Sequence, residues 1–377
     1  MASSPLPPTM KALVCAEAGQ PLTLQTVPTP TALPGSVVVK VIAALTDSNL
    51  PFLLSGKSFF TFPKNLIPGG RFIGRVAVPG PDTTSLPVGQ LVMMEPFLRA
   101  RDNPNLEILW GVFDGGSPTS KKFTADNWSA AGYAEYCRAP LENCHALDEK
   151  ALCGSPEEGG LGYSPYDLLQ LGTLLVAYGG LRGVDLKAGE TVLVAPATGA
   201  YSGAAVHVAV TLGAKVIAMG RNVDELKRVQ ARFPAGRVQI VPNTGDVEAD
   251  AAALQKFGEI DVYIDISPIT ASESTHVRSC FLALKQYGRA SLMGIIKNDL
   301  AMPYQLAVWK NLTIRGQYMY ERKHVRDLIK LAESGVLKLG KEGGIEIVGK
   351  FKFEELEQAF AASAANRGVG KMTILTP

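Results

Sequence analysis

The feature that most constrains the fold is a regular alternation of short apolar runs and helical segments between residues 191 and 293. Thr191–Ala195 reads TVLVA, and Lys215–Met219 reads KVIAM; each is short and apolar enough for a buried strand. Three more strands are expected at 238–241, 261–266 and 289–293, with helices at 204–212, 224–233 and 247–257. Strands that alternate with helices build βαβ units, so we expect an α/β domain with a doubly wound parallel sheet.

The segments on either side have a different pattern. The first part predicts short strands between Gly/Pro turns, which favours a barrel-like β domain with a long irregular loop at 99–130. After residue 307 the alternation breaks, and a strand at 371–375 closes the chain. We expect a disordered tail at 1–9, the β domain at 10–163, a nucleotide-binding domain at 164–306, and a segment at 307–377 that returns to the β domain.

Composition excludes several classes of protein. The 377 residues are 46% hydrophobic, and 37 basic against 35 acidic side chains leave a net charge of +2, so no strong field favours nucleic acid or a membrane surface. No apolar run reaches the ~18–20 residues of a membrane span, and no signal-peptide pattern occurs, so we expect a cytoplasmic protein. The five cysteines form no CxxC, and no two of the four histidines stand at metal-binding spacing.

A glycine-rich turn connects the first two elements of the α/β domain. The strand TVLVA runs into PATGAYSG and then into a helix, a context in which backbone N–H groups bind a pyrophosphate at the helix N-terminus. The glycines stand only at 199 and 203, so a tight turn without a ligand is the alternative. The expected cofactor contacts here are Thr198, Gly199, Ala200, Tyr201 and Ser202, the last through its hydroxyl.

The end of the second strand indicates which dinucleotide binds. An NAD enzyme usually has an acidic residue there to hold the ribose 2′-OH. In this chain Gly220 is followed by Arg221 and Asn222, about 22 residues after Gly199, and Asp224 comes only three residues after the arginine. A guanidinium pairs well with a 2′-phosphate, so we predict NADP(H), with a surface arginine at the sheet edge as the alternative.

A series of short motifs occurs in one order along the chain. They are LPGSVVVKV at 33–41, IPG at 67–69, GYAEY at 132–136, AYGG at 177–180, ETVLV at 190–194, the glycine turn, LGAKV at 212–216, GR at 288–289 and GK at 370–371. In this order they resemble the medium-chain dehydrogenase/reductase superfamily over nearly the whole chain. The resemblance implies a GroES-like β domain with a Rossmann domain inserted before the C-terminal segment.

The chain departs from the zinc-dependent members of that superfamily at every metal ligand. Their first cysteine falls in the loop that is here Leu45–Asn49, and their Gly-His-Glu falls where this chain has Gly69-Gly70-Arg71. Their second cysteine falls near Leu171–Leu174, and no cysteine occurs in 95–125, where a structural zinc would bind. The chain therefore resembles the zinc-independent branch of quinone oxidoreductases and enoyl reductases, which implies catalysis without a metal.

The resemblance places catalysis in the cleft between the two domains and suggests candidate residues. Thr46 or Asp47 stands at the position of the metal-binding cysteine; the hydroxyl can donate to a substrate oxygen and the carboxylate can serve a proton relay, or both simply cap the loop. Tyr178 is a candidate proton donor or a packing residue. Arg71 can bind substrate or cofactor, or form a salt bridge with Asp47. The expected substrate contacts are Asn49, Arg71, Trp128 and Tyr318.

The carboxyl ends of the last two strands supply further expected cofactor contacts, since an open α/β sheet binds its ligands at that edge. From the resemblance, Asp265, Ile266 and Ser267 flank the adenosine side, and Gly294 and Ile295 lie along the nicotinamide ribose.

The expected function is NADPH-dependent, zinc-independent reduction of an activated C=C bond in an enone, enoyl compound or quinone that is small and apolar or aromatic. Two alternatives stay open: a carbonyl reductase or alcohol dehydrogenase without metal, and a non-redox enzyme or nucleotide-binding protein on the same fold. The expected partners are the small-molecule substrate and a second copy of the chain, because the resembled family often dimerises through its Rossmann sheets.

Overall fold

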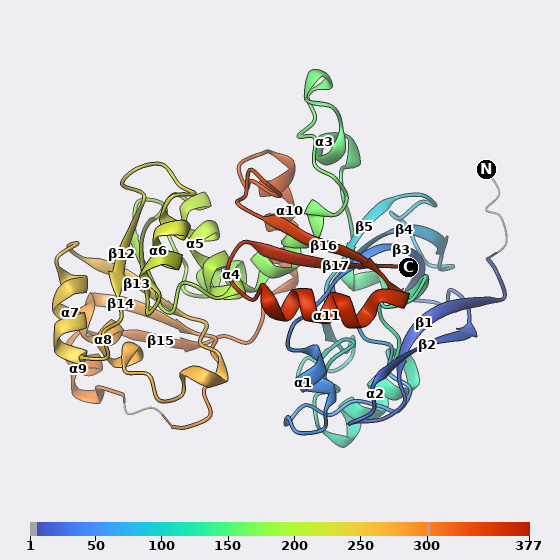
Figure 1. Ribbon diagram of the computed structural model, residues 1–377, viewed down its shortest axis with the longest axis horizontal. Coiled ribbons are helices and arrows are strands. Elements are labelled where there is room, and N and C mark those ends of the chain that lie inside the picture. The colour runs from blue at the N-terminus through green and yellow to red at the C-terminus, as the bar shows by residue number, and fades with distance from the viewer. Residues whose placement is uncertain (1–5, 300–301) are drawn as a thin grey trace. The chain divides into compact units, whose positions relative to one another are not determined.

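The computed structural model describes residues 6–299 and 302–377 and divides into two compact units (Figure 1). Unit 1 comprises the described residues up to Gly172 together with Ile345–Arg367 and Lys371–Pro377, and unit 2 comprises Thr173–Gly344 with Gly368–Gly370. Of the predicted disordered tail, residues 1–5 lie outside the described residues, and the first strand begins at Thr9.

Unit 2 is the predicted doubly wound domain. Its described strands form a parallel sheet in the order β12-β11-β10-β13-β14-β15. The strands are β10 (Thr191–Val194), β11 (Lys215–Gly220), β12 (Val238–Pro242), β13 (Ile260–Asp265), β14 (Leu284–Leu292) and β15 (Thr313–Gly316). Since β10 lies between β11 and β13, the strand order reverses there, and this is where such a sheet binds ligands at its carboxyl edge.

Helices connect these strands and bury the sheet. They are α5 (Ala200–Thr211), α6 (Val223–Gln230), α7 (Val247–Gln255) and α8 (His276–Ala283). The helices α5 and α6 contact the β10–β12 half of the sheet, and α7 and α8 pack against each other. Leu193, Tyr263 and Phe281 are completely buried in the core between sheet and helices. Burial of each such side chain stabilises the fold by roughly 1.5–3 kcal/mol. The packed core therefore holds the strand ends, which carry the site, in place.

Unit 2 extends further along the chain than predicted. Strand β15 pairs with β14, so the segment up to Gly344, with helices α9 (Tyr304–Trp309) and α10 (Arg322–Glu333), belongs to this unit. The predicted boundaries after 163 and 306 thus differ from those in the structure, after 172 and 344. The four residues of β15 are exposed at the end of the sheet, as are Tyr304 and Trp309; a homodimer joined at this edge stays a prediction.

Unit 1 is the predicted β domain. Its main sheet has the order β16-β17-β3-β4-β5-β9, with β8 also paired to β3. These strands are β3 (Ser36–Leu45), β4 (Phe72–Pro79), β5 (Leu91–Met94), β8 (Tyr136–Pro140), β9 (Cys144–Ala146), β16 (Glu346–Lys352) and β17 (Lys371–Thr376). Two smaller ladders pair β1 (Thr9–Cys15) with β2 (Leu22–Pro28) and β6 (Phe97–Arg99) with β7 (Glu107–Leu109). Because β17 pairs with β3, the C-terminal segment returns to this unit, as expected.

Among the helices of unit 1, the C-terminal one packs along β16 and β17. The helices are α1 (Leu50–Leu54), α2 (Pro118–Asn127), α3 (Glu149–Cys153) and α11 (Leu356–Ala365), and α4 (Gln170–Gly183) begins in this unit. The prediction of an irregular loop at 99–130 was wrong, because α2 lies inside it. Ser117 caps this helix through a reciprocal hydrogen-bonded box with Ser120, and Pro118 stands in the first turn. In the described part of the chain, no helix is long and apolar enough to cross a membrane.

Candidate functional site

The glycine turn lies between β10 and α5, at the point where the strand order of unit 2 reverses. Gly199 is the N-cap of α5, and Ser202 Oγ accepts a hydrogen bond from the Gly199 N–H at 3.1 Å. Ser202 is buried and its oxygen caps the helix, whereas Gly199 and Ala200 are exposed. The exposed backbone at a helix N-terminus, rather than the serine hydroxyl, therefore supplies the donors for an anion.

A strap formed by residues 368–370 packs on the glycine turn within unit 2. The Val369 N–H donates to Thr198 O at 3.3 Å, and Gly199 forms a β-bridge with Gly368. A Cβ on Gly203 would lie 2.1 Å from Val369 Cγ2, so this position requires glycine. The glycine at 203 thus serves the approach of the strap, which the sequence analysis did not predict.

Arg232 holds the strap from its other side. Its Nη2 donates to Val369 O at 3.1 Å, and a Cβ on Gly370 would meet the same guanidinium at 2.2 Å. Burial lowers the pKa of Arg232 from its ordinary value. Arg232 is partly buried, and its positive charge beside the turn adds to the positive potential at the N-terminus of α5.

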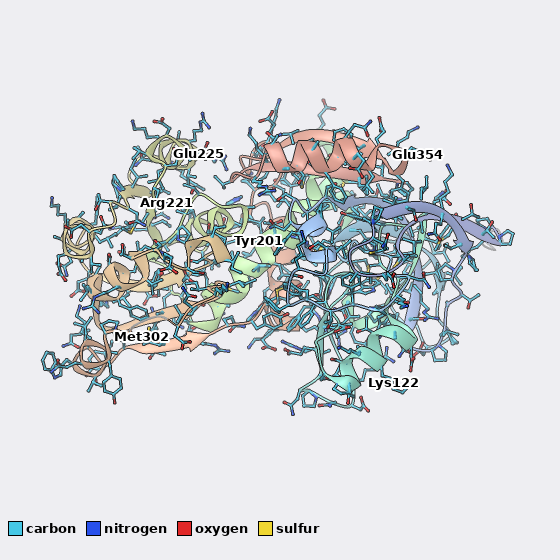
Figure 2. All side chains as sticks on the ribbon, turned by 60° about the horizontal axis from the view of Figure 1, so that its bottom comes forward. Lys122, Tyr201, Arg221, Glu225, Met302 and Glu354 are labelled. Atoms are coloured by element: carbon cyan, nitrogen blue, oxygen red, sulfur yellow. The ribbon has the colours of Figure 1, made fainter. Side chains whose placement is uncertain are left out.

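The end of β11 carries the residues that were predicted to select the cofactor (Figure 2). Gly220 lies beside the glycine turn, because a Cβ there would be 3.4 Å from Thr198 Cγ2. Asn222 Oδ1 accepts hydrogen bonds from the backbone N–H groups of the first turn of α6 at 3.1 Å, so this side chain caps the helix. Arg221 is exposed, and no ion pair is recorded for it among the described residues. Its guanidinium is therefore available to an anion.

The loops after β13 and β14 are joined by backbone hydrogen bonds. Met293 N–H donates to Asp265 O at 2.9 Å, and Ile295 N–H donates to Ser267 O at 2.8 Å. Asp265 and Ser267 are buried, Ile266 is half-buried and Ile295 is exposed. The predicted cofactor contacts at 265–267 and 294–295 thus lie together at the carboxyl edge of the sheet.

Unit 1 brings together residues from three of the segments in which the resemblance places the metal ligands of zinc enzymes. Arg71 Nη2 lies 2.7 Å from Asp47 Oδ2, and Asp47 Oδ1 accepts a hydrogen bond from Asn49 N–H at 2.9 Å. A Cβ on Gly172 would lie 3.3–3.7 Å from the aliphatic carbons of Arg71. The salt bridge left open by the sequence analysis is confirmed, and the arginine stem occupies the space over Gly172.

Thr46 has a buried side-chain oxygen without a hydrogen-bond partner. Its N–H donates to Thr373 O at 3.0 Å and its carbonyl accepts from Ser363 Oγ at 3.2 Å. The side-chain Oγ1 is buried, in a residue 5% exposed, and has no hydrogen-bond partner. An unsatisfied buried hydroxyl costs about 1–3 kcal/mol, so this atom is a candidate donor to a substrate.

The predicted aromatic residues of the site lie in different surroundings. Tyr178 in α4 is buried edge-on to His324, with ring centroids 5.8 Å apart, and burial raises the pKa of its phenol. Tyr318 follows β15 and is about half exposed. Trp128 ends α2 and stacks edge-on with Trp110, at 6.5 Å.

Trp128 belongs to a separate cavity of unit 1. Arg138 lies over its ring at 5.9 Å, and both residues line a cavity of about 240 Å³ together with Phe123, Arg99 and Arg101. The predicted substrate contacts Asn49 and Arg71 are absent from this lining. The structure therefore does not place Trp128 in one recess with them.

The donor set does not fit a zinc ion. In the described ranges 6–299 and 302–377, no group of three or more His, Cys, Asp or Glu side chains is placed to hold a metal. The Asp47 carboxylate is bound to a guanidinium. The space beside Gly172 is filled by the aliphatic carbons of Arg71, and no cysteine sulfur is present there. Zinc sites in proteins need three or four N, S or O ligands around the ion.

Comparison with protein families gives two separate matches. Residues 33–149 match the alcohol dehydrogenase GroES-like domain, and residues 202–334 match the zinc-binding dehydrogenase domain. Together they span about two thirds of the chain, in the order of the two units. These domains and the fold define a two-domain oxidoreductase, and the chain belongs to the medium-chain dehydrogenase/reductase superfamily.

Curated relatives of the chain carry out several reactions. An alcohol dehydrogenase of Aspergillus sp. (notN) is 24% identical over 96% of both chains, and an L-threonine 3-dehydrogenase of Xanthomonas axonopodis is 28% identical over 83% of this chain and 86% of its own. An acryloyl-coenzyme A reductase of Metallosphaera sedula is 29% identical over 53% of this chain and 55% of its own.

Solved structures share the fold over the full length. A chain from Sinorhizobium meliloti solved with NADP superposes with a TM-score of 0.76 at 18% identity, covering 98% of this chain and 99% of that one. An alcohol dehydrogenase from Escherichia coli solved with NADH has a TM-score of 0.73 at 16% identity, covering 98% of this chain and 100% of that one.

The close approach of the strap generates a prediction. Gly203→Ala places a methyl group against Val369, and overpacking of this kind costs about 1–3 kcal/mol, so the variant should melt lower and bind NADPH more weakly. Adding Val369→Gly removes both clashing atoms and should restore part of both properties. Gly316→Ala is the matched control, because no atom lies within 4 Å of its added Cβ. Normal melting and binding in Gly203→Ala would contradict the packing.

Proposed function

We propose that this oxidoreductase uses NADPH, without zinc, to reduce an activated C=C bond in an enone, enoyl compound or quinone that is small and apolar or aromatic. The observation that carries the proposal is the Asp47–Arg71 ion pair over Gly172, which lies in the segments where the resemblance places the zinc ligands. The relative that reduces acryloyl-coenzyme A supports a C=C substrate.

The chemistry that this chain can offer fits such an acceptor. When bound, NADPH supplies a hydride to the β-carbon, and a proton added to the α-carbon completes the reduction. A conjugated acceptor delocalises the developing charge onto its oxygen, where a hydroxyl donor stabilises it without a Lewis acid. Simple carbonyl reduction develops a localised alkoxide, for which a metal is of greater help.

The residues proposed for these roles are Thr46, Asp47 and Tyr178. The buried Thr46 hydroxyl donates to the substrate oxygen, and the Asp47 carboxylate, held by Arg71, fixes the loop that carries it. Tyr178 retains its proton at neutral pH, since burial raises its pKa, and it is the proposed proton donor. Asn49, Arg71, Trp128 and Tyr318 remain proposed substrate contacts; of these, Asn49 and Tyr318 are exposed.

The preference for NADP(H) rests on Arg221. The residue stands where NAD enzymes place an acid, its guanidinium is exposed, and the following Asn222 is occupied in capping α6. An acidic side chain near this position would compete with a 2′-phosphate for the arginine. Glu225, whose carboxylate lies near Gly368, is paired with Arg228 instead. Solved structures of this fold hold either NADH or NADP, so the arginine, not the fold, supports the preference.

A second candidate function is oxidation of an alcohol or reduction of a carbonyl on the same scaffold. The relatives named alcohol and threonine dehydrogenases favour it. It shares the cofactor unit with the first candidate and differs in the atom that receives the hydride.

Removal of the Arg221 guanidinium tests the cofactor preference. Arg221→Ala should raise the KM for NADPH by about tenfold or more and leave the KM for NADH within about twofold, because a charged hydrogen bond to the 2′-phosphate contributes roughly 1.5–3 kcal/mol. Steady-state kinetics with both cofactors measure this. Arg228→Ala, in the following helix α6, is the control for the removal of a nearby cation. An equal loss for both cofactors would remove the assignment.

Isotope transfer identifies the reaction. With NADPH deuterated on either face of C4 in separate runs, and a panel of enones, quinones and ketones, deuterium is expected on the β-carbon of an enone, read by mass spectrometry. Metal analysis of the active protein should find no stoichiometric zinc. Deuterium on a carbinol carbon would establish the second candidate, and binding of NADPH without turnover of any acceptor would exclude both.

Replacement of Thr46 by valine tests its hydroxyl. Because Oγ1 has no hydrogen-bond partner, Thr46→Val should keep or raise the melting temperature, while kcat falls by about tenfold to a hundredfold and the Kd for NADPH stays constant. Thr373→Val is the control, since its backbone carbonyl, not its hydroxyl, contacts Thr46. An unchanged kcat in Thr46→Val would exclude the hydroxyl from the reaction.

A further inference from the structure

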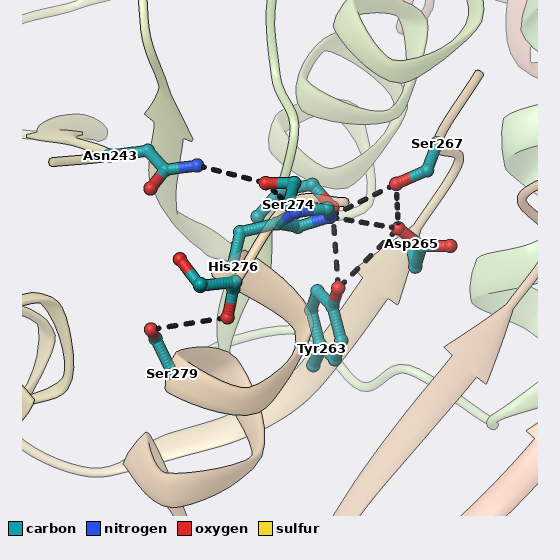
Figure 3. A network of polar contacts seen from close by, with 9 residues as sticks. Asn243, Tyr263, Asp265, Ser267, Ser274, His276 and Ser279 are labelled. Atoms are coloured by element: carbon teal, nitrogen blue, oxygen red, sulfur yellow. Dashed lines mark hydrogen bonds and ion pairs between the residues drawn. The ribbon is translucent and has the colours of Figure 1, made fainter. Parts of the chain in front are cut away.

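A continuous chain of side-chain hydrogen bonds crosses the carboxyl edge of the sheet in unit 2 (Figure 3). It starts at Asn243 after β12, whose Nδ2 lies 3.4 Å from Ser274 Oγ, and Ser274 Oγ lies 2.7 Å from His276 Nδ1. His276 Nε2 then lies 3.0 Å from Ser267 Oγ and 3.3 Å from Asp265 Oδ1, and Ser267 Oγ donates to the same carboxylate oxygen.

The hydrogen bonds of this network are consistent with one direction of proton donation. An amide nitrogen only donates, so Ser274 Oγ accepts from Asn243, and its own proton can point to His276 Nδ1. In that arrangement the imidazole donates from Nε2, which faces Asp265 and Ser267. The chain therefore ends on the Asp265 carboxylate, in a residue 2% exposed.

All the hydrogen bonds recorded for this carboxylate use one oxygen. Tyr263 Oη, Ser267 Oγ and His276 Nε2 all face Oδ1. The other oxygen, Oδ2, faces Gly294, where an added Cβ would lie only 2.4 Å from it. Glycine at 294 therefore lets the backbone of the loop after β14 pack closely against Oδ2, at the sheet edge where an open α/β sheet binds its ligand.

We propose that Asp265 Oδ2 accepts a hydrogen bond from a ribose hydroxyl of the dinucleotide, and that His276 is the positioning residue that holds the carboxylate for this contact. The inference rests on the proposed function, because it needs a dinucleotide in unit 2. The ribose hydroxyls are neutral donors that a dinucleotide offers to a carboxylate, whereas its phosphates are repelled. This acceptor follows β13 and is distinct from the position after β11, where Arg221 stands.

The geometry explains why a histidine is needed. Asp265 and Ser274 are joined only through the imidazole, whose two nitrogens reach both at once. Fixing the side chain before binding lowers the entropy that is lost when the ribose is bound. Loss of the imidazole should therefore weaken binding even though His276 itself touches no ligand.

The test is direct binding of three probes measured by calorimetry: NADPH, 2′-phospho-ADP-ribose, which lacks the nicotinamide, and adenosine 2′,5′-bisphosphate, which retains only the adenosine half. The variants are Asp265→Asn, His276→Leu and His276→Gln, whose amide can replace the Nε2 donor. Ser279→Ala is the control, because this buried serine lies on α8 and bonds only to the Thr275 carbonyl. Melting temperatures are measured for every variant.

We expect Asp265→Asn and His276→Leu to weaken NADPH binding by about tenfold or more, and His276→Gln to recover most of the loss. An equal loss for adenosine 2′,5′-bisphosphate identifies the adenosine ribose as the donor. A loss that spares this probe but affects both NADPH and 2′-phospho-ADP-ribose identifies the other ribose.

Ser274→Ala keeps the inference testable if the buried variants fail to fold, because it breaks the chain and leaves the carboxylate in place. An unchanged Kd for NADPH in a folded Asp265→Asn, His276→Leu or Ser274→Ala protein overturns the inference, as does a loss of binding that only follows the fall in melting temperature. Failure of the unaltered protein to bind NADPH instead overturns the proposed function.

Discussion

Parallel pairing of β10 with both β11 and β13 is the constraint on which the cofactor unit depends. A central strand with neighbours on both sides is buried on both faces, and its carboxyl end opens between helices that lead away in opposite directions. The segment that follows β10 must therefore turn sharply within a small space. The glycine turn does so and leaves the backbone exposed at Gly199 and Ala200. The loops after β11, β13 and β14 reach the same edge, which is why residues far apart in sequence form one site.

In unit 1 the corresponding constraint is electrostatic. The carboxylate of Asp47 and the guanidinium of Arg71 neutralise each other at 2.7 Å, and both are partly buried. Such a pair gives modest stability, because desolvation offsets much of the attraction, but its geometry fixes the loop that presents Thr46. In this chain an ion pair between two side chains therefore orders the loop.

The sequence predicted the parts of the molecule whose signals are local. The run TVLVA, the glycines at 199 and 203 and the arginine at 221 all stand in contiguous segments, and the fold they indicated is confirmed. The boundary after 306 was misplaced because β15 is a short exposed edge strand, and its TIRG sequence has no buried-strand character. Helix α2 was missed although Ser117, Pro118 and Ser120 carry its capping signal.

The polar network of unit 2 was beyond sequence reasoning for a different reason. Asn243 follows β12, Asp265 ends β13 and His276 begins α8, and no spacing along the chain relates them. Their contacts arise from the strand order, which brings the loops after β12 and β13 to one edge. The same holds for the strap, since nothing in the sequence near Val369 indicates a partner at Gly203.

The strap also determines how separable the two units are. The chain leaves unit 1 after Gly172, returns at Ile345, enters unit 2 again for Gly368–Gly370 and goes back at Lys371. A fragment cut at 173 and 344 would contain the entire parallel sheet and still lack the residues that cover its glycine turn. Conversely, a chain shortened before Gly368 would lose both this cover and strand β17, which pairs with β3 and β16. The nucleotide-binding unit is therefore discontinuous, and its last three residues are synthesised only after most of the other unit.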